Sequence, residues 1–157
     1  MPDFKQAEQI KAFADEIFEL STVAWTAQSR SRGKGITELS ETEFLTLDIL
    51  AKAARLYTVG EIQREIGILP AQMSRVIRSL ETKADKPLVA CRINGEDKRK
   101  IDVELTDIGR KAHQAYREIK LGSIQKTLEQ LDEQDRNDFL RILRLIRKNL
   151  HKSLSEN

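Results

Sequence analysis

Residues 100–105 alternate between polar and apolar side chains, with Ile101, Val103 and Leu105 on one parity and Lys100, Asp102 and Glu104 on the other. Elsewhere the apolar residues recur every three or four positions, which is the period of an amphipathic helix. Residues 88–93 and 100–105 therefore predict two short strands, joined through Asn94-Gly95, a strong hairpin signal. The sequence predicts a mainly α-helical fold with one small β-hairpin. Pairing of the strands is expected to bury the alternating side chains of Ile101, Val103 and Leu105.

Two helix-start signals precede the hairpin. Residues 40–43 (SETE) and 58–61 (TVGE) are capping boxes, in which each side chain satisfies a free backbone N–H near the other residue. Gly67 suits the end of the second helix, and Pro70 suits the first position of the next one, which extends to about residue 83. The two helices on either side of this short turn predict a helix-turn-helix.

Long amphipathic segments occupy residues 4–28, 107–131 and 133–152. The first has a heptad-like row of apolar residues, and the apolar stripe of the last is broader than a single contact surface requires. We therefore expect the first and last helices to be buried against a second copy of the chain. The expected interface residues of this homodimer are Ile10, Phe13, Ile17, Phe139, Leu143, Ile146 and Leu150.

The charge is unevenly distributed along the chain. Residues 52–101 carry 11 basic and 6 acidic residues, whereas the net charge of the whole 157-residue chain is only +2. A basic segment indicates a polyanionic partner, although a solvated basic surface gives the same counts. No apolar run approaches the roughly 18 residues of a membrane span, and the N-terminus lacks the apolar core of a signal peptide. We therefore expect a cytoplasmic location.

Enzyme chemistry has little support in the sequence. The chain has 2 histidines and 1 cysteine, with no glycine-rich phosphate loop and no H-E-x-x-H motif. Carboxylates are abundant, but their spacing shows no cluster of metal ligands. The single Cys91 excludes an intrachain disulfide. We expect no catalytic residue, no metal and no cofactor.

The order of helices, helix-turn-helix, hairpin and two long helices resembles the winged-helix regulators of the MarR (multiple antibiotic resistance regulator) family. The most specific segments are residues 39–81 and 93–112. Asp97-Lys98-Arg99 matches the wing-tip D-x-R of the family, and residues 105–109 (LTDIG) match its L-T-x-x-G. Residues 81–89 depart from the family pattern, since they lack its usual glycine and are a few residues longer.

The resemblance implies a winged helix-turn-helix with long N- and C-terminal dimerisation helices. The expected parts are residues 1–36, an N-terminal dimerisation helix and loop; residues 37–106, the DNA-binding domain; and residues 107–157, the C-terminal dimerisation helices. The implied function is that of a sequence-specific double-stranded DNA-binding regulator, a repressor acting as a homodimer on a near-palindromic operator. The alternative is a winged-helix module that binds protein and not DNA, which the basic middle segment and Arg99 disfavour.

In a helix-turn-helix the second helix enters the major groove of DNA. The resemblance implies that the exposed residues Gln72, Ser74, Arg75 and Arg78 make these contacts. Arginine suits guanine acceptors or phosphates, and glutamine suits adenine. The alternative reading is an ordinary solvated helix face.

The expected wing tip carries Lys98, Arg99 and Lys100. The resemblance assigns Arg99 to the adjacent minor groove, whose negative potential attracts arginine. Asp97 is expected to orient Arg99 through a charge-assisted hydrogen bond, while the lysines suit phosphates. Thr58 is a further candidate phosphate donor, although its role as a helix cap alone explains it.

Members of the family often sense a small aromatic or phenolic effector. The candidate residues for such a pocket are Trp25, Phe44, Tyr57, His113 and Tyr116, for which ordinary packing is the favoured alternative. Other members sense oxidants through cysteine. Cys91 stands where arginine is common in the family, on the apolar side of its strand, and a buried thiol there is unreactive unless its pKa is lowered.

Overall fold

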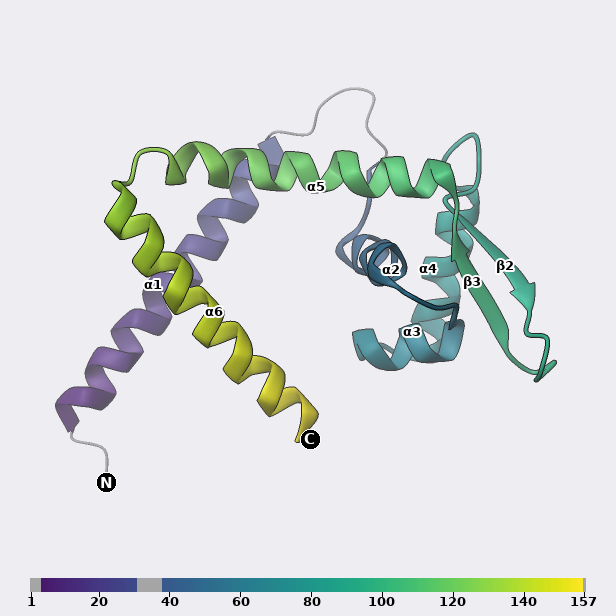
Figure 1. Ribbon diagram of the computed structural model, residues 1–157, viewed down its shortest axis with the longest axis horizontal. Helices are drawn as coiled ribbons and strands as arrows, with labels where there is room; N and C mark the ends of the chain where they lie inside the picture. The colour runs from purple at the N-terminus through teal and green to yellow at the C-terminus, as the bar shows by residue number, and fades with distance from the viewer. Residues whose placement is uncertain (1–3, 31–37, 157) are drawn as a thin grey trace. The chain divides into compact units, whose positions relative to one another are not determined.

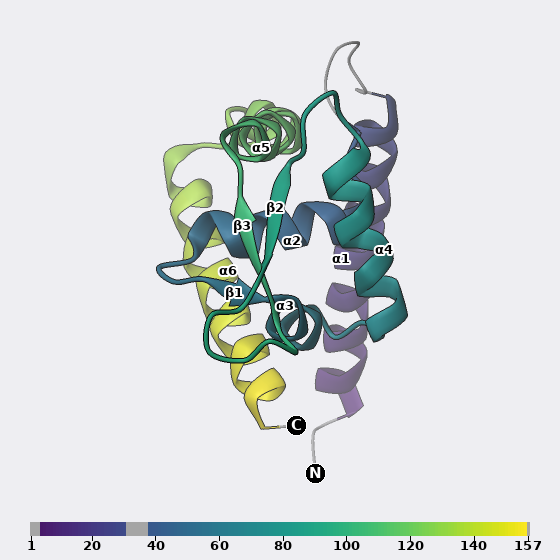
Figure 2. The ribbon, with the colours of Figure 1, turned by 90° about the vertical axis from the view of Figure 1, so that its right-hand side faces the viewer.

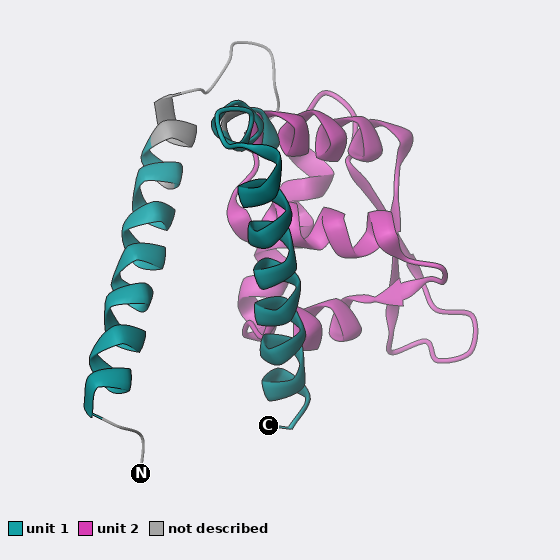
Figure 3. Cartoon of the chain, turned by 60° about the vertical axis from the view of Figure 1, so that its left-hand side comes forward, with its two compact units in different colours: residues 1–28, 121–157 teal, residues 29–120 magenta. Residues whose placement is uncertain are grey.

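A computed structural model describes residues 4–30 and 38–156 of the chain, without the side chains of Trp25, residues 27–30 and Ser123. The chain forms two compact units (Figure 3). Unit 1 comprises residues 1–28 and 121–157, and unit 2 comprises residues 29–120. None of the helices in the described ranges combines the length and apolarity that a membrane crossing requires.

Unit 2 contains a helix-turn-helix and a small antiparallel sheet (Figure 1). The sheet has the order β1-β3-β2, so that β3 lies in the middle (Figure 2). The bounds of the elements are α2 (Glu41–Lys52), β1 (Tyr57–Thr58), α3 (Val59–Ile66), α4 (Pro70–Thr82), β2 (Val89–Ile93), β3 (Ile101–Leu105) and α5 (Asp107–Leu128), whose last turns belong to unit 1. The prediction of a mainly helical winged helix-turn-helix with one hairpin is confirmed.

The local signals in the sequence determine where these helices start and end. Both capping boxes form: Ser40 accepts a hydrogen bond from the backbone of Glu43, and Thr58 accepts one from the backbone of Glu61. Gly67 ends α3 with a φ of 78°, a left-handed conformation that glycine adopts without strain. These short-range bonds satisfy backbone groups that would otherwise be unpaired at the helix ends.

The predicted hairpin forms and its apolar parities meet, with Val89 opposite Leu105 and Cys91 opposite Val103. One expectation is wrong: Ile101 is not buried but 38% exposed. Ile101 pairs with Ile93 at the loop end of the hairpin, beyond the core, whereas Val103 at the centre is 1% exposed. The sequence also gave no sign of β1, a two-residue strand that pairs with β3.

The core of unit 2 draws on every helix and strand around it. Its fully buried apolar side chains are Leu47, Ile62, Met73, Leu80, Leu88, Val89 and Val103. Each buried side chain of this size contributes about 1.5–3 kcal/mol through removal from water. Helices α2, α3 and α4 and the hairpin share this one core. The same packing therefore fixes the position of the hairpin relative to the exposed face of α4.

Unit 1 consists of α1 (Phe4–Arg30), the last turns of α5, and α6 (Glu133–Ser155), whose cap is Asp132. No described residue of α6 is buried. The residues expected at a dimer interface are all exposed in the single chain, by 38% to 60%: Ile10, Phe13, Ile17, Phe139, Leu143, Ile146 and Leu150. An apolar surface of this kind on both helices is unusual for a monomer in water.

Candidate nucleic-acid interface

Helix α4 has one buried face and one charged, exposed face. Met73, Val76, Ile77 and Leu80 face the core of unit 2. The opposite face presents the four residues expected to contact DNA: Gln72, Ser74, Arg75 and Arg78. Neither guanidinium forms a hydrogen bond or ion pair with another described residue, so both are available to a ligand.

Gln72 and Ser74 also serve the start of α4. The side-chain oxygen of Gln72 accepts a hydrogen bond from the backbone N–H of Leu69 at 3.0 Å, and the Ser74 hydroxyl donates to the carbonyl of Pro70 at 3.1 Å. Bidentate pairing with adenine requires both the oxygen and the NH₂ group of glutamine. The bond from Leu69 occupies one lone pair of the Gln72 oxygen, so a bidentate contact with adenine would use the other lone pair together with the NH₂ group.

Leu69 was missed by the sequence interpretation. Its apolar side chain is 69% exposed directly before α4, at the N-cap position, where polar residues are usual. The signal that could have identified it is Pro70, because a proline at the first helical position assigns the preceding residue to the cap. Leu69 adds an apolar group to the end of the helix that carries Gln72 and Arg75.

The loop between β2 and β3 extends beyond the helices of unit 2 (Figure 1). Asn94 organises this loop: its side-chain oxygen accepts from the backbone N–H groups of Glu96 and Asp97 at 3.0 and 2.9 Å. Its NH₂ group donates to the carboxylate of Asp102 at 2.8 Å, and Asp102 is only 7% exposed. The loop is therefore stabilised by its own hydrogen bonds.

Arg99 lies at this tip beside Asp97. The guanidinium of Arg99 donates to both carboxylate oxygens of Asp97, at 3.2 and 3.4 Å, and the Arg99 side chain is 90% exposed. The hydrogen bond from this side chain lowers the pKa of Asp97 below its ordinary value. Exposed pairs of this kind stabilise a fold little. Lys98 and Lys100 are also exposed on the same loop.

Thr58 is the cap of α3 and has its hydrogen-bonding capacity largely occupied. Its hydroxyl accepts from the backbone N–H of Glu61 at 3.3 Å and lies 3.1 Å from a carboxylate oxygen of Glu61, to which it donates. Bonds from the Thr58 backbone, followed by one from Arg55, lower the pKa of Glu61 to about 2. A phosphate contact by the Thr58 hydroxyl would compete with its bond to Glu61.

Some of the expected effector residues pack together and others do not. Phe44 stacks on His113 with ring centroids 5.2 Å apart and tilts against Tyr116 at 5.0 Å. His113 also bonds to Asp48 at 2.9 Å, which ties α5 to α2. Tyr57 is not part of this cluster; its ring lies under the guanidinium of Arg55. The side chain of Trp25 lies outside the described residues.

Cys91 is half-buried in β2. Burial raises the pKa of its thiol to about 11, with the neighbouring Glu81 adding to the effect. The thiolate is the reactive form of cysteine, so a raised pKa suppresses reactivity at neutral pH.

We expect Cys91 of the folded protein to react slowly with a thiol-specific disulfide reagent at neutral pH and faster as the pH approaches about 11. The measurement is the labelling rate as a function of pH, with the urea-unfolded chain as control. The unfolded chain should react rapidly near the ordinary thiol pKa of about 8.5. Equal rates for the folded and unfolded protein at neutral pH would contradict the assignment.

No family model and no curated protein matches the sequence. Solved structures do match the chain over most of both lengths. A MarR family protein from Bacillus stearothermophilus has 17% identity and a TM-score of 0.71, covering 96% of this chain and 99% of the other. The arrangement of helix-turn-helix, hairpin and flanking helices is therefore the one found in that family. The chain has the MarR fold.

Two further structures with the MarR fold contain ligands. FabT from Streptococcus pneumoniae in complex with DNA has 19% identity and a TM-score of 0.69, covering 93% of this chain and 98% of that chain. MepR from S. aureus bound to ethidium bromide has 19% identity and a TM-score of 0.60, covering 88% and 96%. In the MarR fold of this chain, α3 and α4 form the helix-turn-helix and β2 and β3 form the wing.

Proposed function

We propose that this chain is a MarR-type transcriptional regulator that binds double-stranded DNA sequence-specifically in the cytoplasm. The observation that carries the proposal is the pair of exposed cationic elements on unit 2. Arg75 and Arg78 project from the outer face of α4, and Arg99 projects from the tip of the wing. FabT, which has the same fold, is seen in a complex with DNA, which supports the proposal.

Recognition of bases is assigned to α4. A helix of this size enters the major groove, where Arg75 and Arg78 can each donate two hydrogen bonds to guanine or hold a phosphate. A good bidentate contact contributes about 1–3 kcal/mol of discrimination against the wrong base. Gln72 and Ser74 complete the contacting face, Gln72 through its free NH₂ group.

The wing is assigned to the adjacent minor groove. Asp97 holds the guanidinium of Arg99 by two hydrogen bonds, which limits its freedom before DNA binds and so reduces the entropy lost on binding. Lys98 and Lys100 lie beside it and contact phosphates, which contribute affinity with little sequence information. The hydroxyl of Thr58 is proposed as a further phosphate contact, which it can make only after it stops donating to the carboxylate of Glu61.

The regulator acts as a homodimer. The exposed apolar stripes of α1 and α6, described above, are proposed to be buried against a second copy. A two-fold axis would place two α4 helices about 34–36 Å apart, one turn of DNA, on a near-palindromic operator. In this scheme residues 1–36 and 107–157 provide dimerisation and residues 37–106 bind DNA.

A repressor of this kind needs a signal that releases it. We assign that role to a small aromatic or phenolic effector, supported by the ethidium-bound MepR structure. Phe44 and Tyr116 offer ring faces for stacking, and Lys120 lies over both rings at 5.3 and 5.0 Å. Tyr57 and Trp25 are the other aromatic candidates. The chain needs no cofactor and is not an enzyme.

Selection of bound fragments from random DNA tests the proposal directly. We expect a recovered site with two-fold symmetry and an affinity that falls steeply as salt rises, because binding releases counterions from phosphates. Gel shift of the recovered site at several salt concentrations measures this slope. Failure to enrich any sequence would favour a winged-helix module that binds protein.

We expect Arg99→Ala to weaken binding to the recovered operator about tenfold and Lys98→Ala about twofold. Both substitutions remove one positive charge from the same loop, so Lys98→Ala is a matched control for electrostatic attraction. The difference reflects insertion of Arg99 into the minor groove. Fluorescence anisotropy with labelled operator measures both affinities, and equal losses would count against this role of Arg99.

A further inference from the structure

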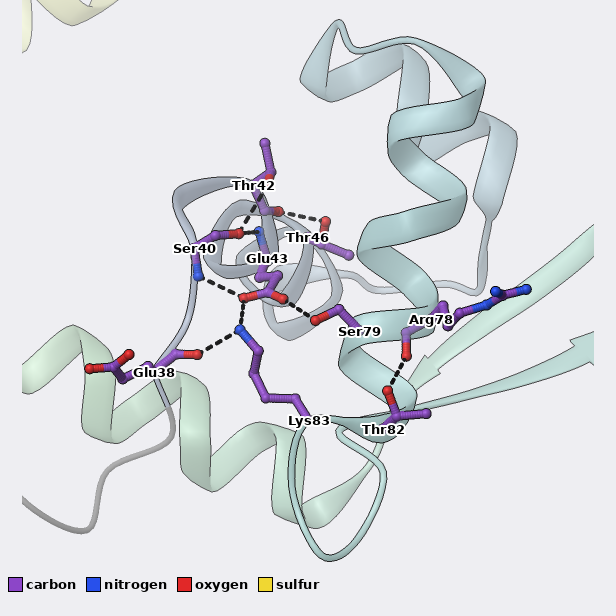
Figure 4. Close-up of polar contacts among 9 residues, drawn as sticks. All are labelled: Glu38, Ser40, Thr42, Glu43, Thr46, Arg78, Ser79, Thr82 and Lys83. Carbon is purple, nitrogen blue, oxygen red and sulfur yellow. Dashed lines mark hydrogen bonds and ion pairs between the residues drawn. The ribbon is translucent and has the colours of Figure 1, made fainter.

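A partly buried polar cluster, centred on the buried carboxylate of Glu43, joins the start of α2 to the end of α4 (Figure 4). The carboxylate of Glu43 accepts hydrogen bonds from the backbone N–H of Ser40 at 2.6 Å, from the hydroxyl of Ser79 at 2.5 Å and from the ammonium of Lys83 at 2.5 Å. Lys83 also donates to the carbonyl of Glu38 at 2.7 Å. We call Glu43, Ser79 and Lys83 the α2–α4 clamp.

The clamp does more than cap α2. A capping box requires only Ser40 and Glu43, yet Glu43 is also bonded to the side chains of Ser79 in α4 and of Lys83 at its C-terminal end, which lie 36 and 40 residues away in the chain. The Glu43 side chain is 5% exposed. Burial by itself raises the pKa of Glu43, but the bonds from Lys83, Ser79 and Ser40 outweigh it and keep the pKa below its ordinary value.

A buried ion pair is weak evidence for stability, because the cost of removing two charges from water offsets much of their attraction. Its better-supported use is to select one arrangement among several of similar energy. The clamp is suited to that use, since both oxygens of Glu43 are directed to specific partners on α4. An apolar contact at the same place would allow α4 to rotate or slide more freely.

The clamp holds the C-terminal part of α4, next to the candidate DNA contacts Arg75 and Arg78. Ser79 and Lys83 are four residues apart and therefore lie one above the other on the helix surface. Arg75 lies four residues before Ser79 in the same row, and Arg78 is the residue adjacent to Ser79, pointing away from Glu43 in Figure 4. Groups that recognise a ligand must be held within about 0.5 Å and 10–20° of the required geometry.

We propose that the α2–α4 clamp is a positioning device that sets the rotation of α4 so that Arg75 and Arg78 meet base edges. This rests on the proposed function, because it concerns how the DNA-binding helix reads sequence. Phosphate contacts tolerate small changes in orientation, whereas bidentate base contacts do not. Loss of the clamp should therefore reduce discrimination between sequences more than it reduces attraction to DNA.

The test is the double variant Glu43→Gln/Lys83→Met in the full-length protein. Glutamine keeps an acceptor for the Ser40 N–H, methionine keeps most of the Lys83 stem, and the net charge of the protein is unchanged. We expect the ratio of operator affinity to random-duplex affinity to fall about tenfold, with random-duplex affinity unchanged. The matched control is Lys152→Met/Glu156→Gln, which removes an exposed ion pair beyond Leu150, the last of the expected interface residues, and should leave the ratio unchanged.

A mutant cycle with Arg75→Ala separates positioning from a general loss of structure. Arg75→Ala should weaken operator binding about tenfold in the wild type but much less in the clamp variant, because interacting sites are not additive. Ser79→Ala removes one clamp bond without removing a charge, so it remains informative if the double variant folds poorly. We expect it to lower the same ratio by a smaller factor.

The outcomes distinguish the two proposals. A wild-type protein with no preference for any sequence would overturn the regulator function itself. Two other outcomes would overturn only the positioning role, provided that the wild type prefers its operator. One is a clamp variant with the same preference as the wild type. The other is a loss of operator affinity in the clamp variant that simply adds to the loss caused by Arg75→Ala.

Discussion

Ile146→Glu is expected to convert the protein to a monomer and to reduce operator affinity by roughly a hundredfold or more. Ile146 is 40% exposed in the single chain and lies in the apolar stripe of α6. In the proposed dimer a carboxylate at this position would be buried without a partner, which costs several kcal/mol. Each separated chain could then engage only one half-site, and the gain from simultaneous binding would be lost.

Light scattering after size-exclusion chromatography measures the mass, and anisotropy measures the affinity. Asn137→Glu is the matched control, because it adds the same charge about two and a half turns away, on the opposite face of α6. The control should remain dimeric and bind the operator normally. A monomeric wild type, or an Ile146→Glu variant that stays dimeric, would contradict the proposed interface; Leu143→Glu provides an independent repeat.

Gly109→Ala is expected to destabilise the protein by about 3 kcal/mol and to lower its melting temperature by about 10 °C. A Cβ at Gly109 would lie 1.9 Å from the carbonyl oxygen of Leu88 and 2.8 Å from the Leu105 side chain. The Leu105 contact is with the end of a flexible side chain, but the Leu88 carbonyl belongs to the backbone and cannot move easily. The Leu88 carbonyl accepts hydrogen bonds from the backbone N–H and the hydroxyl of Thr106, and the Leu88 side chain is fully buried.

Gly122→Ala is the matched control for this substitution, since it makes the same change in the same helix. Apart from its chain neighbours and the backbone of its own helix, no described atom lies within 4 Å of a Cβ at Gly122, and alanine is the better helix former by about 1 kcal/mol. Thermal unfolding followed by circular dichroism should show a lowered melting temperature for Gly109→Ala and an equal or higher one for Gly122→Ala. Equal melting temperatures for Gly109→Ala and the wild type would show that the backbone at Leu88 can move to accommodate the added Cβ, and would contradict the prediction.

The Gly109 contact gives a physical reason for the L-T-x-x-G segment at residues 105–109. Thr106 caps α5, accepting a hydrogen bond from the backbone N–H of Gly109 at 2.9 Å, and it donates to the carbonyl groups of Pro87 and Leu88. Glycine then lets the first turn of α5 approach the segment that enters the wing. The sequence motif was visible without a structure, but the reason for its glycine was not.

The exposure of Lys98, Arg99 and Lys100 was expected from the sequence, because they lie in the loop of the predicted hairpin, but alternation did not predict that Asp102 is only 7% exposed. The exposure of Ile101 could not be predicted from the sequence, since it depends on where the hairpin passes beyond the core. The hydrogen bond between Gln72 and Leu69 was also not predicted, whereas the capping bond of Thr58 followed from the capping box at residues 58–61. Both residues combine a candidate DNA contact with a helix-capping bond.

The sequence by itself determined the helix starts at Ser40 and Thr58 and the turn at Gly67, because these depend on hydrogen bonds between residues close in the chain. Only the tertiary structure decided the pairing of β1 with β3, the bond between His113 and Asp48, and the α2–α4 clamp. The last two join residues 65 and 40 positions apart. No local pattern encodes such contacts, because they form only when the shared core brings the helices together.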